Sequence, residues 1–180
     1  MIPYWPFIVA ALLAVAGVAF SWRRFQRQIG VLEYAWVQLE EQLERRHDLA
    51  DRLVELVRSV VADSEPWADN VATARKSAAE LANSTADAQR WENELAFAVR
   101  ALLDHVDGHP ELNGNVTFRN VTHRLIAVDG RILGVVDAYN ELARYYNRRI
   151  ERPPTSIISR IARFRPVALL DLEPTMEDEH

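Results

Sequence analysis

The hydrophobic positions of the chain follow two patterns, a continuous apolar run near the N-terminus and several amphipathic stretches after it. Residues 2–22 contain no charged side chain, and every residue from Phe7 to Phe20 is apolar apart from one glycine. A helix of about twenty residues, rising about 1.5 Å per residue, crosses the roughly 30 Å hydrocarbon core of a bilayer. The run therefore predicts a transmembrane helix over residues 1–24.

The residues that flank this run indicate its orientation. Aromatic side chains lie at both ends, where they suit the membrane interfaces, and basic residues follow the run but do not precede it. Ala14-Val15-Ala16 has the composition of a cleavage site, but a signal peptide carries its positive charge before the apolar run, so we expect a retained anchor. The positive-inside rule places the N-terminus outside and the rest of the chain in the cytoplasm. The predicted anchor residues are Tyr4, Trp5, Phe7, Phe20, Trp22, Arg23 and Arg24.

Four later stretches have apolar residues spaced three or four residues apart, as in helices that bury one face. The first is interrupted only by Arg46 on its apolar face, and the third begins with Ser84 and Asp87, a spacing typical of a helix start. The last places Val135 and Leu142 on its apolar face. The four stretches are residues 29–60, 66–81, 84–106 and 118–152.

The sequence therefore predicts an all-α protein, in which the transmembrane helix is followed by an antiparallel four-helix bundle over residues 25–152 with long first and last helices. Residues 153–166 form a short basic amphipathic segment, which lies either on an anionic bilayer surface or against the bundle's own core. If the chain does not break at Ser84, three long helices place this segment at the far end instead. Residues 167–180 are acidic and are expected to form a disordered tail. The candidate membrane-surface residues are Ile157, Ile158, Arg160, Ile161, Arg163, Phe164 and Arg165.

Composition narrows the possible functions. The chain has no cysteine, which excludes disulfides, thiolate metal sites and a cysteine nucleophile. Its formal charge of −5 resides in the acidic C-terminal residues, and the body lacks a basic block, so we expect no nucleic-acid binding. Glu44 and His47 have the spacing of a di-iron ligand pair, but the helical frame places Glu44 outside the buried face. We found no catalytic constellation, and we expect no enzyme activity, metal or cofactor.

Two groups of polar residues form a candidate interaction patch. In the first, Arg46 falls on a buried face, where an unpaired guanidinium is costly. It either snorkels, or pairs with a facing carboxylate that fixes the register of the helices, or belongs to a recognition surface for a partner or an anionic ligand. In the second, a Tyr-Asn pair recurs after seven residues, which is typical either of core packing with amide hydrogen bonds or of a ligand site. The patch comprises Arg45, Arg46, Asp48, Tyr139, Asn140, Tyr146 and Asn147.

The chain contains the blocks Glu33–Leu39, Gln42–Leu49 and Leu53–Val57, then His109–Leu112 with Asn115 and Phe118, and then Tyr139-Asn140 and Tyr145–Asn147. In their order and spacing these blocks resemble the LemA family. The resemblance covers nearly the whole chain to about Phe164, and it implies a bacterial, membrane-anchored four-helix bundle with a short external N-terminus. It implies no catalytic residues, because the family has none assigned. The chain departs from the family at Val128-Asp129-Gly130, where the family usually has a Thr-Glu-Asn-like stretch. It also departs at Arg163-Phe164-Arg165, where the C-terminal end of the family's sequences is usually apolar and glycine-rich.

The favoured hypothesis is a non-enzymatic interaction or scaffolding module, tethered by a single span to the cytoplasmic face of the cell membrane and binding other membrane proteins. The alternative is a lipid-surface or membrane-organising protein that uses residues 157–165 as an interfacial helix. The sequence does not predict an oligomeric state.

Overall fold

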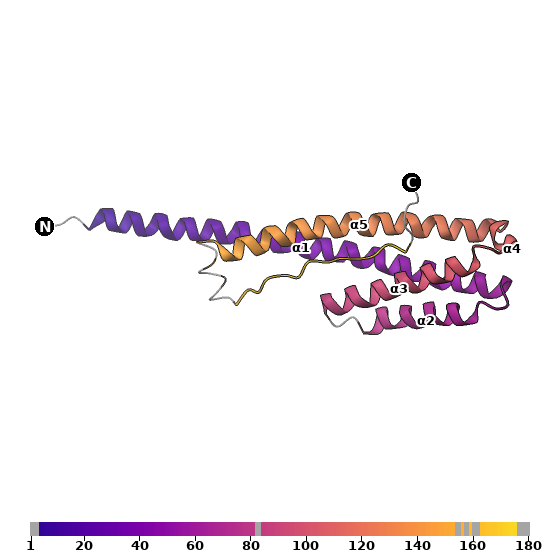
Figure 1. The fold of residues 1–180 in the computed structure, drawn as a ribbon. Coiled ribbons are helices and arrows are strands. Elements are labelled where there is room, and N and C mark those ends of the chain that lie inside the picture. Colours follow the sequence, from indigo (N-terminus) through magenta and orange to yellow (C-terminus); the bar gives the residue numbers. More distant parts are fainter. Residues whose placement is uncertain (1–3, 82–83, 154–155, 157–158, 160–162, 176–180) are drawn as a thin grey trace. The chain divides into compact units, whose positions relative to one another are not determined.

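The structure is a computed structural model that describes residues 4–81, 84–153, 156, 159 and 163–175. Every regular element in these ranges is a helix (Figure 1), which confirms the predicted all-α class. The helices are α1 (Trp5–Val60), α2 (Glu65–Glu80), α3 (Thr85–Val106), α4 (Pro110–Asn113) and α5 (Val116–Glu151).

The helix boundaries follow local chemistry. Ser84 has an extended backbone, and its hydroxyl accepts a hydrogen bond from the amide of Asp87 at 3.1 Å, which caps the start of α3. Pro66 lies in the first turn of α2, where the missing N–H costs little. α5 ends two residues before Pro153, as the clash with a following proline requires. The predicted helix start at Ser84 is confirmed.

The chain divides into two compact units, and α1 and α5 contribute to both. Unit 1 comprises Met1–Trp36 and Tyr139–Leu169, and unit 2 comprises Val37–Ala138 and Leu170–His180.

In unit 1, the N-terminal part of α1 packs antiparallel to the C-terminal part of α5. The rings of Trp36 and Tyr139 lie 5.9 Å apart between centroids. Further along, Tyr146 and Ile150 of α5 are buried and pack against residues that come earlier in α1. Their partly buried neighbours are Trp22, Ile29, Phe164 and Val167.

In unit 2, the buried faces of the helices match most of the predicted apolar positions. α2 and α3 pack side by side (Figure 1). Complete burial of a leucine or valine side chain contributes about 1.5–3 kcal/mol, so these faces account for much of the stability. The buried apolar residues include Leu39, Ala50, Leu53 and Val57 of α1, Val71, Ala74 and Ala78 of α2, Leu95, Val99, Leu102 and Val106 of α3, and Phe118, Val121, Leu125, Val128 and Ile132 of α5.

The buried face of α5 departs from the predicted one in its second half. Val136 and Ala143 are buried, whereas Val135 and Leu142 are only partly buried. A straight helix has about 3.6 residues per turn, so a strict seven-residue pattern drifts by about 20° per heptad. Over several heptads the drift moves the buried face by one residue.

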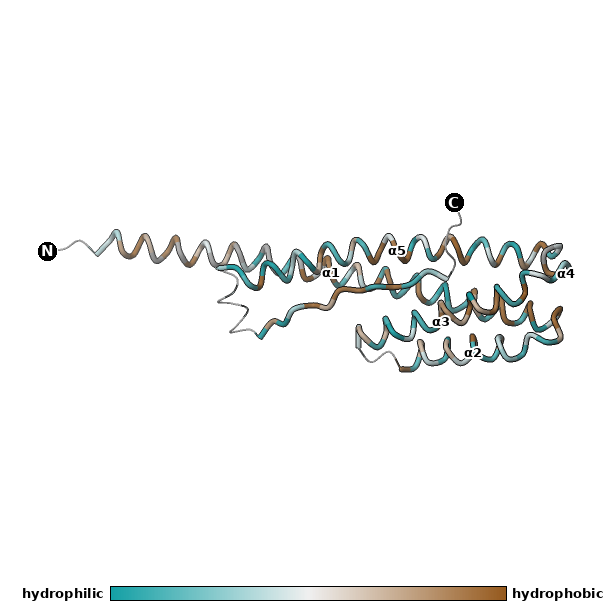
Figure 2. Tube along the Cα trace, in the orientation of Figure 1, coloured by the Kyte–Doolittle hydropathy of each residue, from teal (hydrophilic) through white to brown (hydrophobic). Residues whose placement is uncertain are grey.

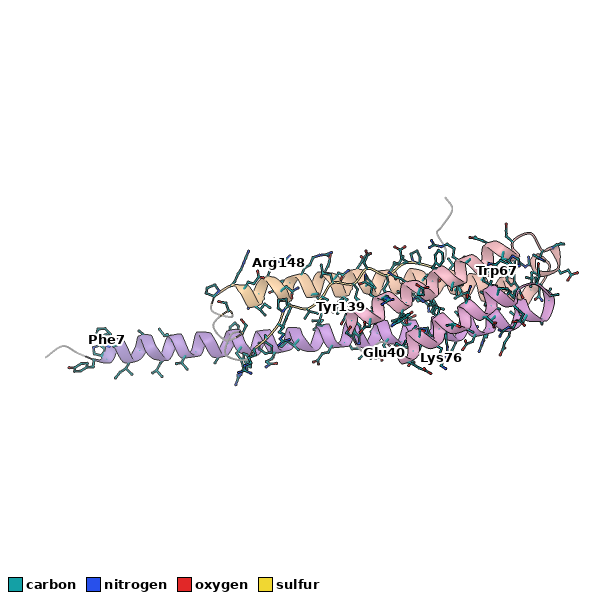
Figure 3. All side chains as sticks on the ribbon, turned by 60° about the horizontal axis from the view of Figure 1, so that its bottom comes forward. Phe7, Glu40, Trp67, Lys76, Tyr139 and Arg148 are labelled. Atoms are coloured by element: carbon teal, nitrogen blue, oxygen red, sulfur yellow. The ribbon has the colours of Figure 1, made fainter. Side chains whose placement is uncertain are left out.

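The start of α1 carries apolar side chains that nothing in unit 1 covers. Figure 2 shows hydrophobic colours along it, and Figure 3 shows Phe7 on a stretch of α1 with no other segment beside it. Within the described residues, no helix has an apolar stretch long enough to span a membrane. The transmembrane helix therefore stays a prediction. The exposed apolar residues at this end are Tyr4, Trp5, Phe7, Ile8, Val9, Leu12, Leu13, Val15 and Phe20.

Candidate functional site

A cluster of charged side chains is buried between three helices of unit 2. The Arg46 side chain on α1 is 0% exposed, and its Nη2 donates to Oε2 of Glu92 on α3 at 2.5 Å and to the Glu92 carbonyl at 3.1 Å. Its Nη1 lies 3.6 Å from Oδ1 of Asp129 on α5, and it donates to the Glu173 carbonyl at 3.4 Å. One guanidinium thus joins two carboxylates from different helices, which is the pairing considered for Arg46 from the sequence.

His47 joins the cluster through Glu92. Its Nε2 lies 2.8 Å from Oε1 of Glu92, so both carboxylate oxygens of Glu92 have a partner. Burial raises the pKa of Glu92, but the hydrogen bond with His47 and the positive charge of Arg46 outweigh burial, so the pKa lies below its ordinary value. Glu44, the other half of the di-iron spacing, is exposed.

The C-terminal segment covers this cluster. The Thr175 amide donates to Oδ2 of Asp129 at 2.7 Å, and the Thr175 hydroxyl donates to the same oxygen. Leu170, Leu172 and Thr175 are buried. Asp129 is therefore held from both sides, by Arg46 and by Thr175.

Residues 170–175 thus differ from the predicted disordered tail. The acidic composition suggested solvation, but Leu170 and Leu172 alternate with charged residues, so an extended chain can bury both leucines on one side. This alternation was the signal in the sequence. Val167, at the start of the predicted tail, is also held, because its backbone bonds the Asn147 side chain. Residues 176–180, the end of the predicted tail, lie outside the described residues.

The charged half of the candidate interaction patch is split by the fold. Arg46 is buried and cannot meet a partner, whereas Arg45 and Asp48 are exposed, and Arg45 pairs with Glu41 at 2.5 Å. Arg45 and Asp48 line a surface pocket of about 250 Å³ between α1 and α5. On both helices the lining residues are spaced as one helical face. They are Arg45, Asp48, Leu49 and Arg52 of α1 and Arg124, Ala127, Val128 and Arg131 of α5.

We call this pocket the arginine groove. Among the residues that the structure describes, no carboxylate pairs with Arg52, Arg124 or Arg131. Arg52 and Arg124 also line a neighbouring pocket of about 430 Å³, so they share one end of the groove. Sequence reasoning missed these three arginines, although two of them repeat the seven-residue spacing of Arg45 and Arg52.

The Tyr-Asn half of the patch faces inward. Tyr139 and Tyr146 are buried, which raises the pKa of each phenol. The Asn147 amide donates to the Val167 carbonyl at 2.8 Å and accepts from the Val167 amide at 2.8 Å, and the Tyr139 hydroxyl donates to the Ala168 carbonyl at 3.2 Å. Asn140 is also buried. These side chains hold the chain after α5 against that helix, rather than forming an open site.

The predicted basic amphipathic segment is described only in part. The Phe164 ring lies 6.0 Å from the Trp22 ring, and Arg163 and Arg165 are exposed on either side of Phe164. Arg23, in the predicted anchor, is exposed as well. The remaining predicted positions, Ile157, Ile158, Arg160 and Ile161, lie outside the described residues.

Comparison with known proteins gives one family. The LemA family matches residues 35–179. No curated protein matches the chain.

Proposed function

The chain belongs to the LemA family, and we propose that it is a non-enzymatic interaction module held at the cytoplasmic face of the cell membrane by its N-terminal helix. The observation that carries this proposal is the uncovered apolar surface at the start of α1. Phe7 is 68% exposed, Ile8 59% and Phe20 70%. Exposed apolar surface costs about 25 cal/mol per Å² in water, so a stretch of this length calls for an apolar surrounding.

The geometry of the stretch favours lipid over a protein groove. Consecutive residues of a helix point about 100° apart, so Phe7, Ile8 and Val9 face three directions, and all three are exposed. A partner that packs on one face would leave the others in water, whereas a bilayer surrounds the helix. The basic residues Arg23, Arg24 and Arg27 follow this stretch and support a cytoplasmic orientation for the rest of the chain.

Membrane insertion is tested by charged substitutions within the apolar stretch. We expect the full chain to resist alkaline extraction from membranes, and the double variant Leu12→Arg, Val15→Arg to be extracted, because each arginine near the bilayer centre costs about 2.5–3.5 kcal/mol on insertion scales. The matched control, Leu12→Ala with Val15→Ala, should stay in the membrane pellet. Equal retention of both double variants would rule out a membrane-embedded helix.

The interaction role rests on the arginine groove. Four guanidinium groups line it, and Asp48 is the only acidic side chain among its lining residues. The guanidinium groups lie close together and repel one another, so the groove favours an acidic ligand. Leu49 and Val128 add apolar contact. A membrane protein with an acidic cytoplasmic helix or loop has the matching chemistry.

The groove is tested by photo-crosslinking in intact membranes. A photoreactive residue at Ala127, inside the groove, should give a discrete crosslinked product, and the product should disappear with Arg52→Glu plus Arg124→Glu. The control position is Lys76 on α2 (Figure 3), which is exposed and lies outside the pocket lining. A product of the same size from both positions, or one that persists after charge reversal, would reject the groove as the interaction surface.

A second candidate function is binding to the lipid surface. It is favoured by the contact of Phe164 with Trp22, which holds the basic segment beside the end of the apolar stretch in unit 1. The Leu12→Arg, Val15→Arg variant isolates this activity. If the segment binds lipid, the variant floats with anionic vesicles at low salt and loses flotation when Arg163 and Arg165 are changed to glutamate. No flotation with anionic vesicles would exclude this function.

A further inference from the structure

We propose that unit 2 contains a binding site for an extended peptide, formed by α1, α3 and α5, which the chain's own residues 170–175 occupy in this structure. The residues that bond this segment are not among those that line the arginine groove, and the ligand is recognised by different chemistry. We call residues 170–175 the C-terminal strap. Figure 1 shows the strap as a stretched trace without helix.

Side-chain amides of α3 hold the backbone of the strap. The Asn93 amide donates to the Asp171 carbonyl at 3.1 Å, and its oxygen accepts from the Glu173 amide at 2.9 Å. Gln89, one turn earlier on α3, accepts from the Asp171 amide at 3.2 Å. These bonds satisfy peptide groups as a neighbouring strand would, and they are independent of the side chain that each residue of the ligand carries.

Buried and exposed side chains follow a clear pattern along the strap. Leu170 and Leu172 are buried, while Asp171 and Glu173 between and after them are exposed. Thr175 is 0% exposed, and its amide and hydroxyl both bind Asp129. The site therefore selects a six-residue pattern, with apolar residues at its first and third positions and a hydroxyl residue at its sixth. The second, fourth and fifth positions accept any residue.

Two arginines also bond the backbone of the strap. Its backbone also accepts from Arg100 at the Pro174 carbonyl, 2.7 Å away, and from Arg46 at the Glu173 carbonyl. Departure of the strap would remove these partners from Arg46, Arg100 and Asp129, and a bound peptide that restores the same bonds recovers their free energy. The empty site therefore favours a peptide with the same pattern from a partner protein.

Tethering explains why such a site is normally closed. A ligand attached to the same chain through a short linker has an effective concentration of about the millimolar range. A free peptide must compete with that concentration, so the intact chain binds it weakly. Substitutions that release the strap should open the site without altering the residues of α1, α3 and α5 that form it.

The experiment measures binding of a fluorescent, acetylated peptide Leu-Asp-Leu-Glu-Pro-Thr to the full chain in detergent. The release variant, Leu170→Asp with Leu172→Asp, should bind it at least about tenfold more tightly than the unaltered chain, because the tethered competitor is removed. In the release variant, Asn93→Leu should weaken binding by about tenfold or more, since it removes two backbone bonds. A peptide with valine in place of threonine should also bind the release variant more weakly.

If the release variant unfolds, which a loss of its helical circular dichroism signal would reveal, two further measurements still test the proposal. The milder Leu172→Ala variant loosens the strap without adding charge, and the unaltered chain at millimolar peptide should show saturable binding. Failure of every folded protein to bind the peptide would overturn the proposal. Equal binding of the threonine and valine peptides, or no effect of Asn93→Leu, would overturn it too.

Discussion

Replacing Arg46 with methionine is expected to lower the free energy of unfolding by about 3–5 kcal/mol, the cost of leaving buried carboxylates without their partner. The side chain is 0% exposed, and Glu92 and Asp129, which it joins, are themselves buried. Methionine fills much of the same space, so the loss reports the missing charge rather than a cavity. Urea denaturation of the full chain in detergent, followed by circular dichroism at neutral pH, measures the change.

Two companion variants separate the charge of Arg46 from its geometry. Arg46→Lys keeps the charge, but one ammonium group cannot match a planar guanidinium that bonds Glu92 and the Glu173 carbonyl while facing Asp129, so an intermediate loss is expected. Arg46→Met combined with Glu92→Leu should cost less than the sum of the two single losses, because it removes both members of a pair. An Arg46→Met protein as stable as the original would mean that water already solvates the two carboxylates.

The position of Arg46 could be predicted from the sequence, but its partners could not. The spacing of apolar residues placed it on the buried face of α1, and the cost of an unpaired guanidinium made a facing carboxylate one of the expected arrangements. Glu92 is separated from it by 46 residues, and it lies beside, not on, the apolar positions that predicted the buried face of α3. Helical periodicity fixes which face is buried, while the identity of a neighbour across the core depends on how helices pack.

The C-terminal strap marks a second limit of sequence reasoning. Charge composition led to the prediction of a disordered tail, because composition describes how a segment interacts with water. It does not describe side chains elsewhere that can satisfy the segment's backbone. Here Gln89 and Asn93 of α3 do so, and Asp129 binds Thr175. These partner residues lie far from the strap in the sequence, so no local sequence pattern predicts that they bind it.

Stability against acid is expected to depend on Glu92. Its pKa in the folded chain lies below the ordinary value of 4.5, whereas the unfolded chain has the ordinary value. Between these two values the unfolded state binds more protons, so lowering the pH favours unfolding. The contribution of the Glu92 carboxylate is therefore fully present above the ordinary value and is lost as the pH falls through the folded value. Urea denaturation over a pH series should show this loss below about pH 5.

The matched variants are Glu92→Gln and His47→Leu. Glutamine does not titrate, and it offers Arg46 and His47 one acceptor oxygen and one NH2 donor in place of two carboxylate oxygens. This variant is therefore less stable at neutral pH, and its curve should approach that of the original chain in acid. His47→Leu removes the strongest interaction that lowers the pKa of Glu92, so the loss of stability should begin at a higher pH. If stability falls with pH equally in the original chain and in Glu92→Gln, other carboxyl groups cause the acid sensitivity. Asp129, which faces the same guanidinium, would then be the next group to replace.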